Sequence, residues 1–245
     1  MNPFDQQMAI GRFHRCTPAF ARALGFATAG VCALLEAAPR CYVSLSFGKQ
    51  SICLAHLVWS IAPATPMHFL ASEETWMLYD YERVIAEFTD RFPIALTIHQ
   101  THRISGADTW KHARDAGDQD LQQMCPRAEW DGWFWGLATE ESPMRRATLL
   151  AGYGQDTPHP SIFRYRDGRL RGCPLMHWGV DDLAAYIARH DLPLLNIYRR
   201  FGLQQRTTAR VTKKMLRNQG MAICRMTNSS GFRRLVNRFP EVNVQ

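Results

Sequence analysis

One short segment of the sequence combines side chains that proteins use to bind phosphate groups. Residues 46–51 have the sequence Ser46-Phe47-Gly48-Lys49-Gln50-Ser51. Lys49 supplies positive charge, the two serines supply hydroxyl donors, and Gly48 lets the backbone approach an anion closely. The segment is not a Walker A loop, because Val43 stands where that motif requires its first glycine. We therefore predict a phosphate-binding loop at 46–51, with all six residues as candidate nucleotide contacts.

The elements around this loop alternate between strands and helices. Short β-prone runs predict strands at 41–45, 67–70, 93–98 and 130–137, and apolar positions at helical spacing predict helices at 19–38, 52–61, 74–88 and 181–189. A turn at Asp167-Gly168 favours a hairpin, and a further helix is expected at 208–218. This alternation predicts an α/β fold with a doubly wound, mainly parallel sheet and helices on both faces. The loop would then follow a strand and begin a helix, where anions bind.

Charge is distributed unevenly along the chain. From Leu192 to the end there are eleven Arg or Lys residues and one acid, Glu241. We predict two parts, a nucleotide-binding α/β domain at 1–198 and a basic C-terminal segment at 199–245 packed on or beside it. A concentrated basic surface favours a polyanionic partner, and a merely solvated surface is the alternative.

Targeting signals and cysteine pairs are both missing from the sequence. It lacks a run of eighteen apolar residues and a cleavable leader pattern, so we expect a cytoplasmic protein without membrane association. The seven cysteines include no C-x-x-C pair, which argues against a disulfide framework and a zinc ribbon. His99, His102 and His112 show no metal-ligand spacing and are expected to be solvated loop residues.

Four motifs, in order, resemble the phosphoadenosine phosphosulfate (PAPS) reductase and ATP pyrophosphatase superfamily, whose fold is the adenine nucleotide alpha hydrolase-like fold. The hexad at 46–51 is similar to the family's S-[GF]-G-K-D-S loop. Residues 69–75 (FLASEET) resemble its second strand, which ends in an acid and a threonine, and residues 136–146 (GLATEESPMRR) resemble its G-x-R-x-x-E-S-x-x-R segment. Residues 174–198 resemble its P-x-x-x-W and L-P-x-N stretches. The resemblance covers roughly residues 40 to 205.

The chain also departs from the family pattern. Gln50 replaces the usual acid of the loop, and Ala138 replaces the first arginine of the third motif. The E-C-G-x-H motif that carries the nucleophilic cysteine of the reductases does not occur, since the chain ends RFPEVNVQ, and the paired cysteines of the iron–sulfur members are also missing. We therefore expect no iron–sulfur cluster and consider PAPS reduction the less favoured chemistry.

The resemblance implies roles for residues outside the loop. Glu74 would lie near the adenosine end of the nucleotide, and Lys49 and Arg145 would neutralise the leaving pyrophosphate. Glu141 would hold Mg²⁺ or orient Arg145, with an ordinary i,i+4 surface pair as the alternative. Further candidate contacts with phosphate are Ser142 and Arg146. Cys173, with Arg171 and His177 nearby, is the candidate for sulfur relay, although a buried thiol is the favoured alternative.

The leading hypothesis is an ATP pyrophosphatase that forms AMP and pyrophosphate, activating an acceptor for sulfur transfer. Members of this size without reductase cysteines resemble the ATP pyrophosphatase component of DNA phosphorothioation systems. That resemblance implies DNA as acceptor, a cysteine desulfurase or other sulfur donor as partner, and ATP with Mg²⁺ as cofactors; a homodimer is compatible with it. The alternatives are a sulfonucleotide reductase, a non-catalytic nucleotide-binding subunit that recruits partners to DNA, and a transfer-RNA thiolase.

Overall fold

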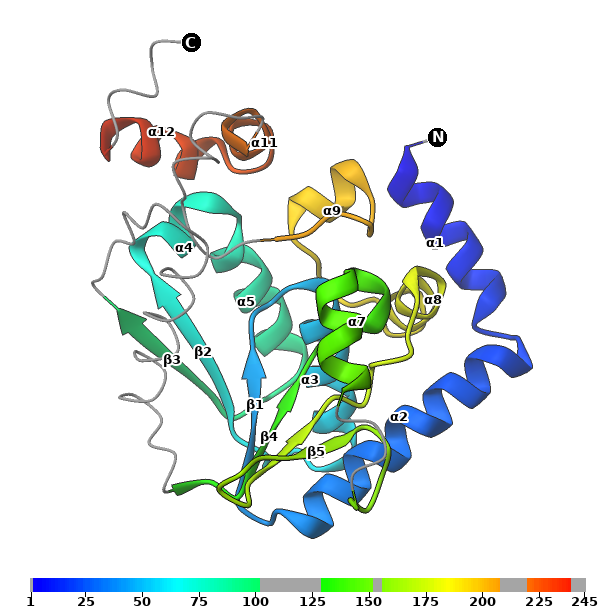
Figure 1. Ribbon diagram of the computed structural model, residues 1–245. Coiled ribbons are helices and arrows are strands. Elements are labelled where there is room, and N and C mark those ends of the chain that lie inside the picture. The colour runs from blue at the N-terminus through cyan, green and yellow to red at the C-terminus, as the bar shows by residue number, and fades with distance from the viewer. Residues whose placement is uncertain (1, 102–128, 152–155, 208–219, 239–245) are drawn as a thin grey trace.

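A six-stranded sheet in the order β3-β2-β1-β4-β6-β5 forms the centre of the protein (Figure 1). The structure is a computed structural model and describes residues 2–101, 129–151, 156–207 and 220–238. Neighbouring strands are parallel except for the antiparallel pair β5–β6. The strands are β1 (Cys41–Leu45), β2 (Met67–Ser72), β3 (Leu96–Thr101), β4 (Gly132–Trp135), β5 (Ile162–Arg164) and β6 (Leu170–Gly172).

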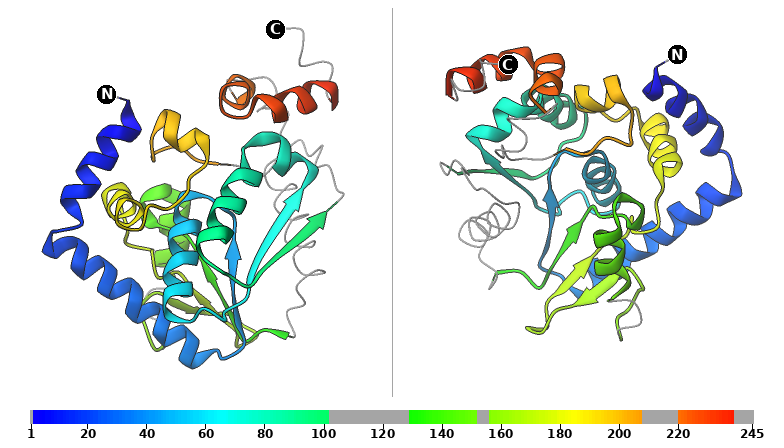
Figure 2. Two further views of the ribbon diagram at one scale, coloured as in Figure 1. Left: turned by 180° about the vertical axis from the view of Figure 1, so that it is seen from behind. Right: turned by 45° about the horizontal axis from the view of Figure 1, so that its top comes forward.

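Helices surround the sheet and lie across its carboxyl edge. Before the sheet come α1 (Pro3–His14) and α2 (Pro18–Ala37); between strands lie α3 (Lys49–Ile61), α4 (Glu73–Leu78), α5 (Tyr81–Arg91), the 3₁₀ turn η2 (Thr139–Glu141) and α7 (Pro143–Leu150); after it follow α8 (Val180–His190), α9 (Asn196–Phe201), α11 (Gly220–Thr227) and α12 (Ser229–Arg238). Seen from behind, α2, α3, α5 and α8 cover one face of the sheet (Figure 2).

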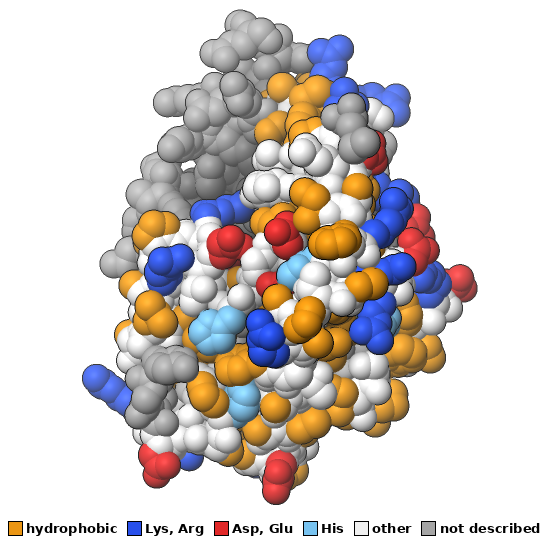
Figure 3. All heavy atoms as spheres, turned by 90° about the vertical axis from the view of Figure 1, so that its right-hand side faces the viewer, with side chains coloured by type: hydrophobic (Ala, Val, Ile, Leu, Met, Phe, Trp, Pro, Cys, Tyr) orange, Lys and Arg blue, Asp and Glu red, His pale blue; other side chains and the backbone are white. Residues whose placement is uncertain are grey.

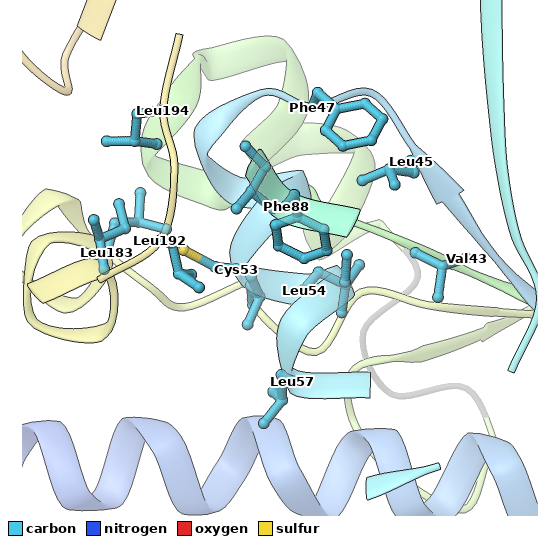
Figure 4. Close-up of a cluster of buried hydrophobic side chains, with 14 of the residues drawn as sticks. Val43, Leu45, Phe47, Cys53, Leu54, Leu57, Phe88, Leu183, Leu192 and Leu194 are labelled. Carbon is cyan, nitrogen blue, oxygen red and sulfur yellow. The ribbon is translucent and has the colours of Figure 1, made fainter. Parts of the chain in front are cut away.

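The main core lies between that face and its helices. Successive strand residues point to opposite faces, so Val43 and Leu45 of β1 face α3 and α5, where they pack with Leu54 and Phe88 (Figure 4). The strand residues that alternate with these point to the other face of the sheet. Phe163 of β5 is one of them, and it belongs to a second apolar cluster with Leu149 of α7. Both faces are therefore covered, as the predicted doubly wound α/β fold requires.

The strand order places the chain's change of direction next to β1. From β1 the chain winds outward through β2 to β3, and β4 then pairs with the opposite side of β1. The segments that leave β1 and β4 consequently diverge at the carboxyl edge of the sheet, where open α/β sheets form their ligand crevice. The predicted loop at 46–51 and the segment 136–146 are these two segments.

Helix α2 is long and apolar enough to cross a membrane by length and composition alone. One face of it, which includes Phe20, Ala27 and Leu34, is buried in the protein core. Of the tested window, 28% is buried inside the protein; the core helix of a soluble protein and an N-terminal signal sequence pass the same test, so this helix alone does not show a membrane span.

Several predicted boundaries were wrong. The helix expected at 74–88 is two helices, because the chain turns at Tyr79 and Asp80; the Asp80 carboxylate accepts hydrogen bonds from Asn196 N and Arg83 instead of continuing a helix. Strand β3 begins three residues later than expected, after Pro93, and α1 and α7 had no predicted counterpart. The helix expected at 208–218 lies outside the described residues.

The C-terminal helices dock on the sheet domain next to α4. Cys224 Sγ and Asn228 Nδ2 both donate to Met77 O, each at 3.3 Å, and Arg234 Nη2 donates to Trp76 O at 2.8 Å. Figures 1 and 2 show α11 and α12 beside α4 at the carboxyl edge of the sheet. The boundary expected between residues 198 and 199 falls inside α9, and the division into two parts stays a prediction.

Candidate active site at the phosphate loop

The loop after β1 has the form of an anion-binding helix start. Gly48 is the N-cap of α3 and, having no side chain, leaves the first N–H groups of the helix without a side-chain cap. Ser46 N donates to Ser51 Oγ at 2.8 Å, which closes the loop on itself. The first N–H groups of the helix and the positive end of the helix dipole attract a phosphate at this position.

Phe47 contributes to the loop in a way that the sequence did not indicate. Its side chain is fully buried and makes edge-to-face contacts with Phe69 and Phe88, at ring-centroid distances of 5.1 and 6.2 Å (Figure 4). Its φ of 51° is in the left-handed region, which few residues other than glycine adopt. The ring therefore holds the loop to the core, and the nucleotide contact expected of Phe47 stays a prediction that falls to its backbone.

The loop is also held in place from the side of β4. A Cβ atom built on Gly136 would lie 3.0 Å from both Ser51 Cα and Ser51 N, so only glycine fits without a backbone shift. This close approach brings the segment after β4 against the first turn of α3. The loop after β1 and the segment after β4 thus meet in one site.

Lys49 is almost completely buried beside the loop, with 4% of its surface exposed. Its Nζ donates to Gln205 O at 2.8 Å and lies 5.4 Å from the centre of the Tyr198 ring. Burial lowers the pKa of Lys49 to about 8, since the attraction of Glu141, which raises it, only partly compensates. Lys49 therefore loses its proton at a lower pH than an exposed lysine does. An anion bound beside it would stabilise its charged form.

Glu141 and Arg145 form an ion pair across the turn that starts α7. Glu141 Oε2 also accepts from Ala138 N at 3.2 Å, and Ser142 Oγ caps α7 by accepting from Arg145 N at 3.1 Å. The pair fits both the predicted orienting role of Glu141 and the alternative of an ordinary i,i+4 surface pair, and the role of Glu141 stays a prediction. Within the described ranges no group of three or more His, Cys, Asp or Glu residues surrounds it.

A cavity of about 860 Å³ opens beside these groups. It extends from Lys49, Gln50 and Glu141 outward between α1 and the start of α8, so its far wall comes from the N-terminal helices. Figure 3 shows this side of the molecule, on which acidic, basic and apolar side chains are interspersed. Gln50, which replaces the family's acid, faces the cavity without adding negative charge.

Two residues predicted to contact the nucleotide, Glu74 and Arg146, take no part in the ion pair between Glu141 and Arg145. Glu74 is buried in the first turn of α4, directly after β2, where the adenosine end was expected. Arg146 is exposed on α7, next to Arg145 in the sequence. Neither residue is among those that line the cavity beside Lys49.

Cys173 is completely buried in the apolar cluster with Leu149 and Met176. Burial raises the pKa of its thiol to about 12, and the opposing effect of Arg171 is smaller. Cys173 therefore lies where the favoured alternative, a buried thiol, placed it, and its role in sulfur relay stays a prediction. None of the cysteines that the structure describes lines the cavity, and Cys125 lies outside the described residues.

The histidine predictions are partly tested. His99 lies on β3 rather than in a loop, and its Nε2 is 2.7 Å from His68 Nδ1, so the expectation of a solvated loop residue is wrong for it. His102 and His112 lie outside the described residues.

Three site residues were not identified from the sequence. Tyr198 contacts the loop through its hydroxyl, 3.4 Å from Lys49 N; Gln205 accepts from Lys49 Nζ; and Arg206 lines the cavity with Lys49. Tyr198 lies in a recognised motif, whereas Gln205 and Arg206 lie in a segment whose sole signal was its positive charge.

Comparisons with known proteins agree with this architecture. Residues 40–202 match the model of the phosphoadenosine phosphosulfate reductase domain. Adenosine 5'-phosphosulfate reductase of Bacillus cytotoxicus is 28% identical over 68% of this chain and 73% of its own length, and phosphoadenosine 5'-phosphosulfate reductase of Xylella fastidiosa is 27% identical over 66% and 69%. FMN adenylyltransferase of Candida glabrata shares the fold, with a TM-score of 0.53 and 14% identity over 80% of this chain and 67% of that one.

Proposed function

Because the chain belongs to the phosphoadenosine phosphosulfate reductase domain family, we propose that it binds an adenine nucleotide at 46–51 and cleaves ATP to AMP and pyrophosphate. The observation that carries this proposal is the cavity beside the loop, where Lys49 and Arg206 gather but no described cysteine does. Neutralising cations suit a pyrophosphate leaving group, whereas sulfonucleotide reduction requires a thiol.

In the proposed reaction, an acceptor oxygen attacks the α-phosphorus while the bond to the bridging oxygen of the β-phosphate breaks. Pyrophosphate leaves with that oxygen, and the acceptor keeps the adenylyl group; with water as acceptor the product is AMP. The N–H groups at the start of α3 and the Lys49 ammonium stabilise the growing charge on pyrophosphate. The Arg145 guanidinium, which is paired with Glu141, would add positive charge near Lys49.

The site is compatible with a magnesium ion held jointly with the nucleotide. Mg²⁺ binds through one or two carboxylates together with substrate phosphates, and Glu141 is the carboxylate that borders both the cavity and Lys49. The ion would add positive charge at the phosphates. Positioning of the nucleotide remains the task of the loop.

For the acceptor, we propose the DNA backbone, with sulfur supplied by a partner such as a cysteine desulfurase. Exposed arginines on α11 and α12 support a polyanionic acceptor, since they lie beside α4 at the carboxyl edge of the sheet. These are Arg225, Arg233, Arg234 and Arg238. Arginines of this kind contact phosphates without regard to base sequence.

Reduction of a sulfonucleotide is the second candidate function, and the names of the curated relatives favour it. It would need a thiol from outside the described cavity, because the pKa values of Cys53 and Cys173 are raised by burial. It predicts sulfite release that depends on thioredoxin.

Product analysis separates the two functions. The protein is incubated with Mg²⁺ and ATP, and in parallel with PAPS, thioredoxin and a reductant. AMP and pyrophosphate that disappear in Lys49→Ala but persist in Arg22→Ala, an exposed arginine that does not line the cavity, support the proposal. Sulfite from PAPS would establish the reductase instead. ATP binding without either product would favour a non-catalytic nucleotide-binding subunit.

A further inference from the structure

We propose that Arg206 is a phosphate-binding residue of this site, carried to the loop by the backbone segment 202–207, which we term the covering segment. The proposal rests on the proposed function and names a third cation, beside Lys49 and Arg145, for the di- or triphosphate end of the nucleotide. Three features support it: the position of the segment, its anchoring and the state of the Arg206 side chain.

The covering segment lies directly against the phosphate loop. Gln205 O accepts the hydrogen bond from Lys49 Nζ at 2.8 Å. Thr207 Oγ1 is 3.1 Å from the Tyr198 hydroxyl, and a Cβ atom built on Gly48 would lie 3.4 Å from it. The residue between Gln205 and Thr207 is therefore held beside the loop on both sides.

The segment is anchored at its other end by α1. Leu203 is fully buried, and its N–H donates to Gln7 Oε1 at 2.6 Å. The same Gln7 side chain donates through Nε2 to Gln204 Oε1. Gly202, with a φ of 89°, allows the sharp change of direction that leads from α9 into the segment. Position 206 is thus set by contacts from both α1 and α3.

The Arg206 side chain is exposed and lines the same cavity as Lys49, Gln50 and Glu141. Its positive charge is close enough to contribute to the lowered pKa of Lys49. Within the described part of the chain no carboxylate forms an ion pair with Arg206, whereas Arg145 is paired with Glu141. A phosphate in this cavity would therefore meet Arg206 without displacing an acid, and the planar guanidinium matches two phosphate oxygens at once.

The cavity also suggests that Arg206 takes the place of the arginine that the resembling motif has at position 138. Ala138, where the resembling motif has an arginine, lines this cavity together with Arg206. A positive charge placed on either residue would face the same space. The structure thus allows the charge missing after β4 to be supplied by the covering segment instead.

The test measures binding of inorganic pyrophosphate and of AMP by titration calorimetry. Arg206→Ala should weaken pyrophosphate binding on the order of tenfold or more, as loss of a hydrogen bond to a charged group does, and leave AMP binding unchanged. Ala138→Arg combined with Arg206→Ala should recover most of the loss. The matched control is Arg200→Ala, an exposed arginine of α9 that does not line the cavity.

Unchanged pyrophosphate affinity in Arg206→Ala would overturn the inference, as would an equal loss in Arg200→Ala. Lys49→Ala separates this failure from a failure of the proposed function. If Lys49→Ala loses pyrophosphate binding while Arg206→Ala does not, the loop assignment stands and Arg206 has no role. If neither variant loses it, the loop itself is wrongly assigned. Arg206→Lys, which keeps the charge, should bind with intermediate affinity and unfold at the same temperature as wild type.

Discussion

Burial directly affects the chemistry of the Lys49 side chain. A lysine enclosed by the loop, Tyr198 and the covering segment gives up most of its hydration, which is why its pKa falls to about 8. Phosphate would restore at short range the stabilisation that water supplied. The same burial also sets a pH limit on binding.

We expect pyrophosphate affinity to fall as pH rises from 7 to 9. Lys49 is charged below its pKa of about 8 and neutral above it, and the anion binds only the charged form strongly. Calorimetric titrations at several pH values give the profile. Lys49→Arg, which stays charged throughout, should bind equally at pH 7 and pH 9, and a similar fall in that variant would assign the pH dependence to another group.

At the scale of elements, the site exists because two segments approach without side chains between them. Gly136 ends β4 against the first turn of α3, and Gly48 begins that helix without a capping side chain. Phe47 pulls the loop toward the core at the cost of a left-handed backbone. The geometry of the loop therefore depends on contacts with β4 and α5 more than on its own sequence.

Gly136→Ala should reduce ATP affinity on the order of tenfold, because the added methyl group would meet backbone atoms of Ser51 that cannot rotate away. The control is Gly25→Ala in α2, where a Cβ meets nothing within 4 Å. That control should keep full affinity and unfold at a slightly higher urea concentration, since alanine favours a helix by about 1 kcal/mol over glycine. Full ATP affinity in Gly136→Ala would show that the approach is not needed for binding.

At the scale of the whole molecule, the basic residues of the C-terminal helices lie in one place. The basic helices α11 and α12 are fixed to α4 by hydrogen bonds to Trp76 O and Met77 O, so their arginines lie at the edge of the sheet that carries the site. A nucleic acid bound to these helices, as proposed, would lie beside α4 at the carboxyl edge of the sheet (Figure 1).

Reversing charge on α12 tests this arrangement. Arg233→Glu with Arg238→Glu should weaken binding to duplex DNA and lower the slope of log affinity against log salt by about 2, because each of the two arginines would otherwise neutralise one phosphate. Arg15→Glu with Arg22→Glu, at the corner between α1 and α2, changes net charge equally and should affect both quantities less. Equal effects from the two pairs would indicate a general charge effect and no defined surface.

Acid stability is a second property of the whole fold. His56 joins α3 to α8 through the hydroxyl of Tyr186 at 2.9 Å, and burial, with His190 and Arg91 nearby, lowers the pKa of His56 from 6.5 to about 4. The unfolded chain therefore binds a proton before the folded one does, and stability present above pH 6.5 should be lost as pH falls toward 4. Urea midpoints between pH 7 and pH 4.5 measure this loss. His56→Gln, which does not titrate, should lose less over the same range, and a slope equal to wild type would contradict the assignment.

Local sequence was enough to predict the framework of this protein. The strand at 41–45 forms with its predicted bounds, because periodicity, propensity and glycine position act over a few neighbouring residues. The helix after it ends at the predicted Ile61 but begins at Lys49, three residues earlier than expected. The order of four motifs indicated the family that residues 40–202 match. The loop, and the pairing of Glu141 with Arg145, required no knowledge of distant parts of the chain.

Only the tertiary structure decided what these residues meet. Phe47 turns into the core because Phe69 and Phe88 leave room for it there, and Cys173 is enclosed by a helix, α7, that was not predicted from the sequence. Arg206 lines the same cavity as Lys49 because Gln7, almost two hundred residues earlier, holds the covering segment. Such contacts join residues far apart in the chain, and no local pattern records them because either partner alone would fit many other surroundings.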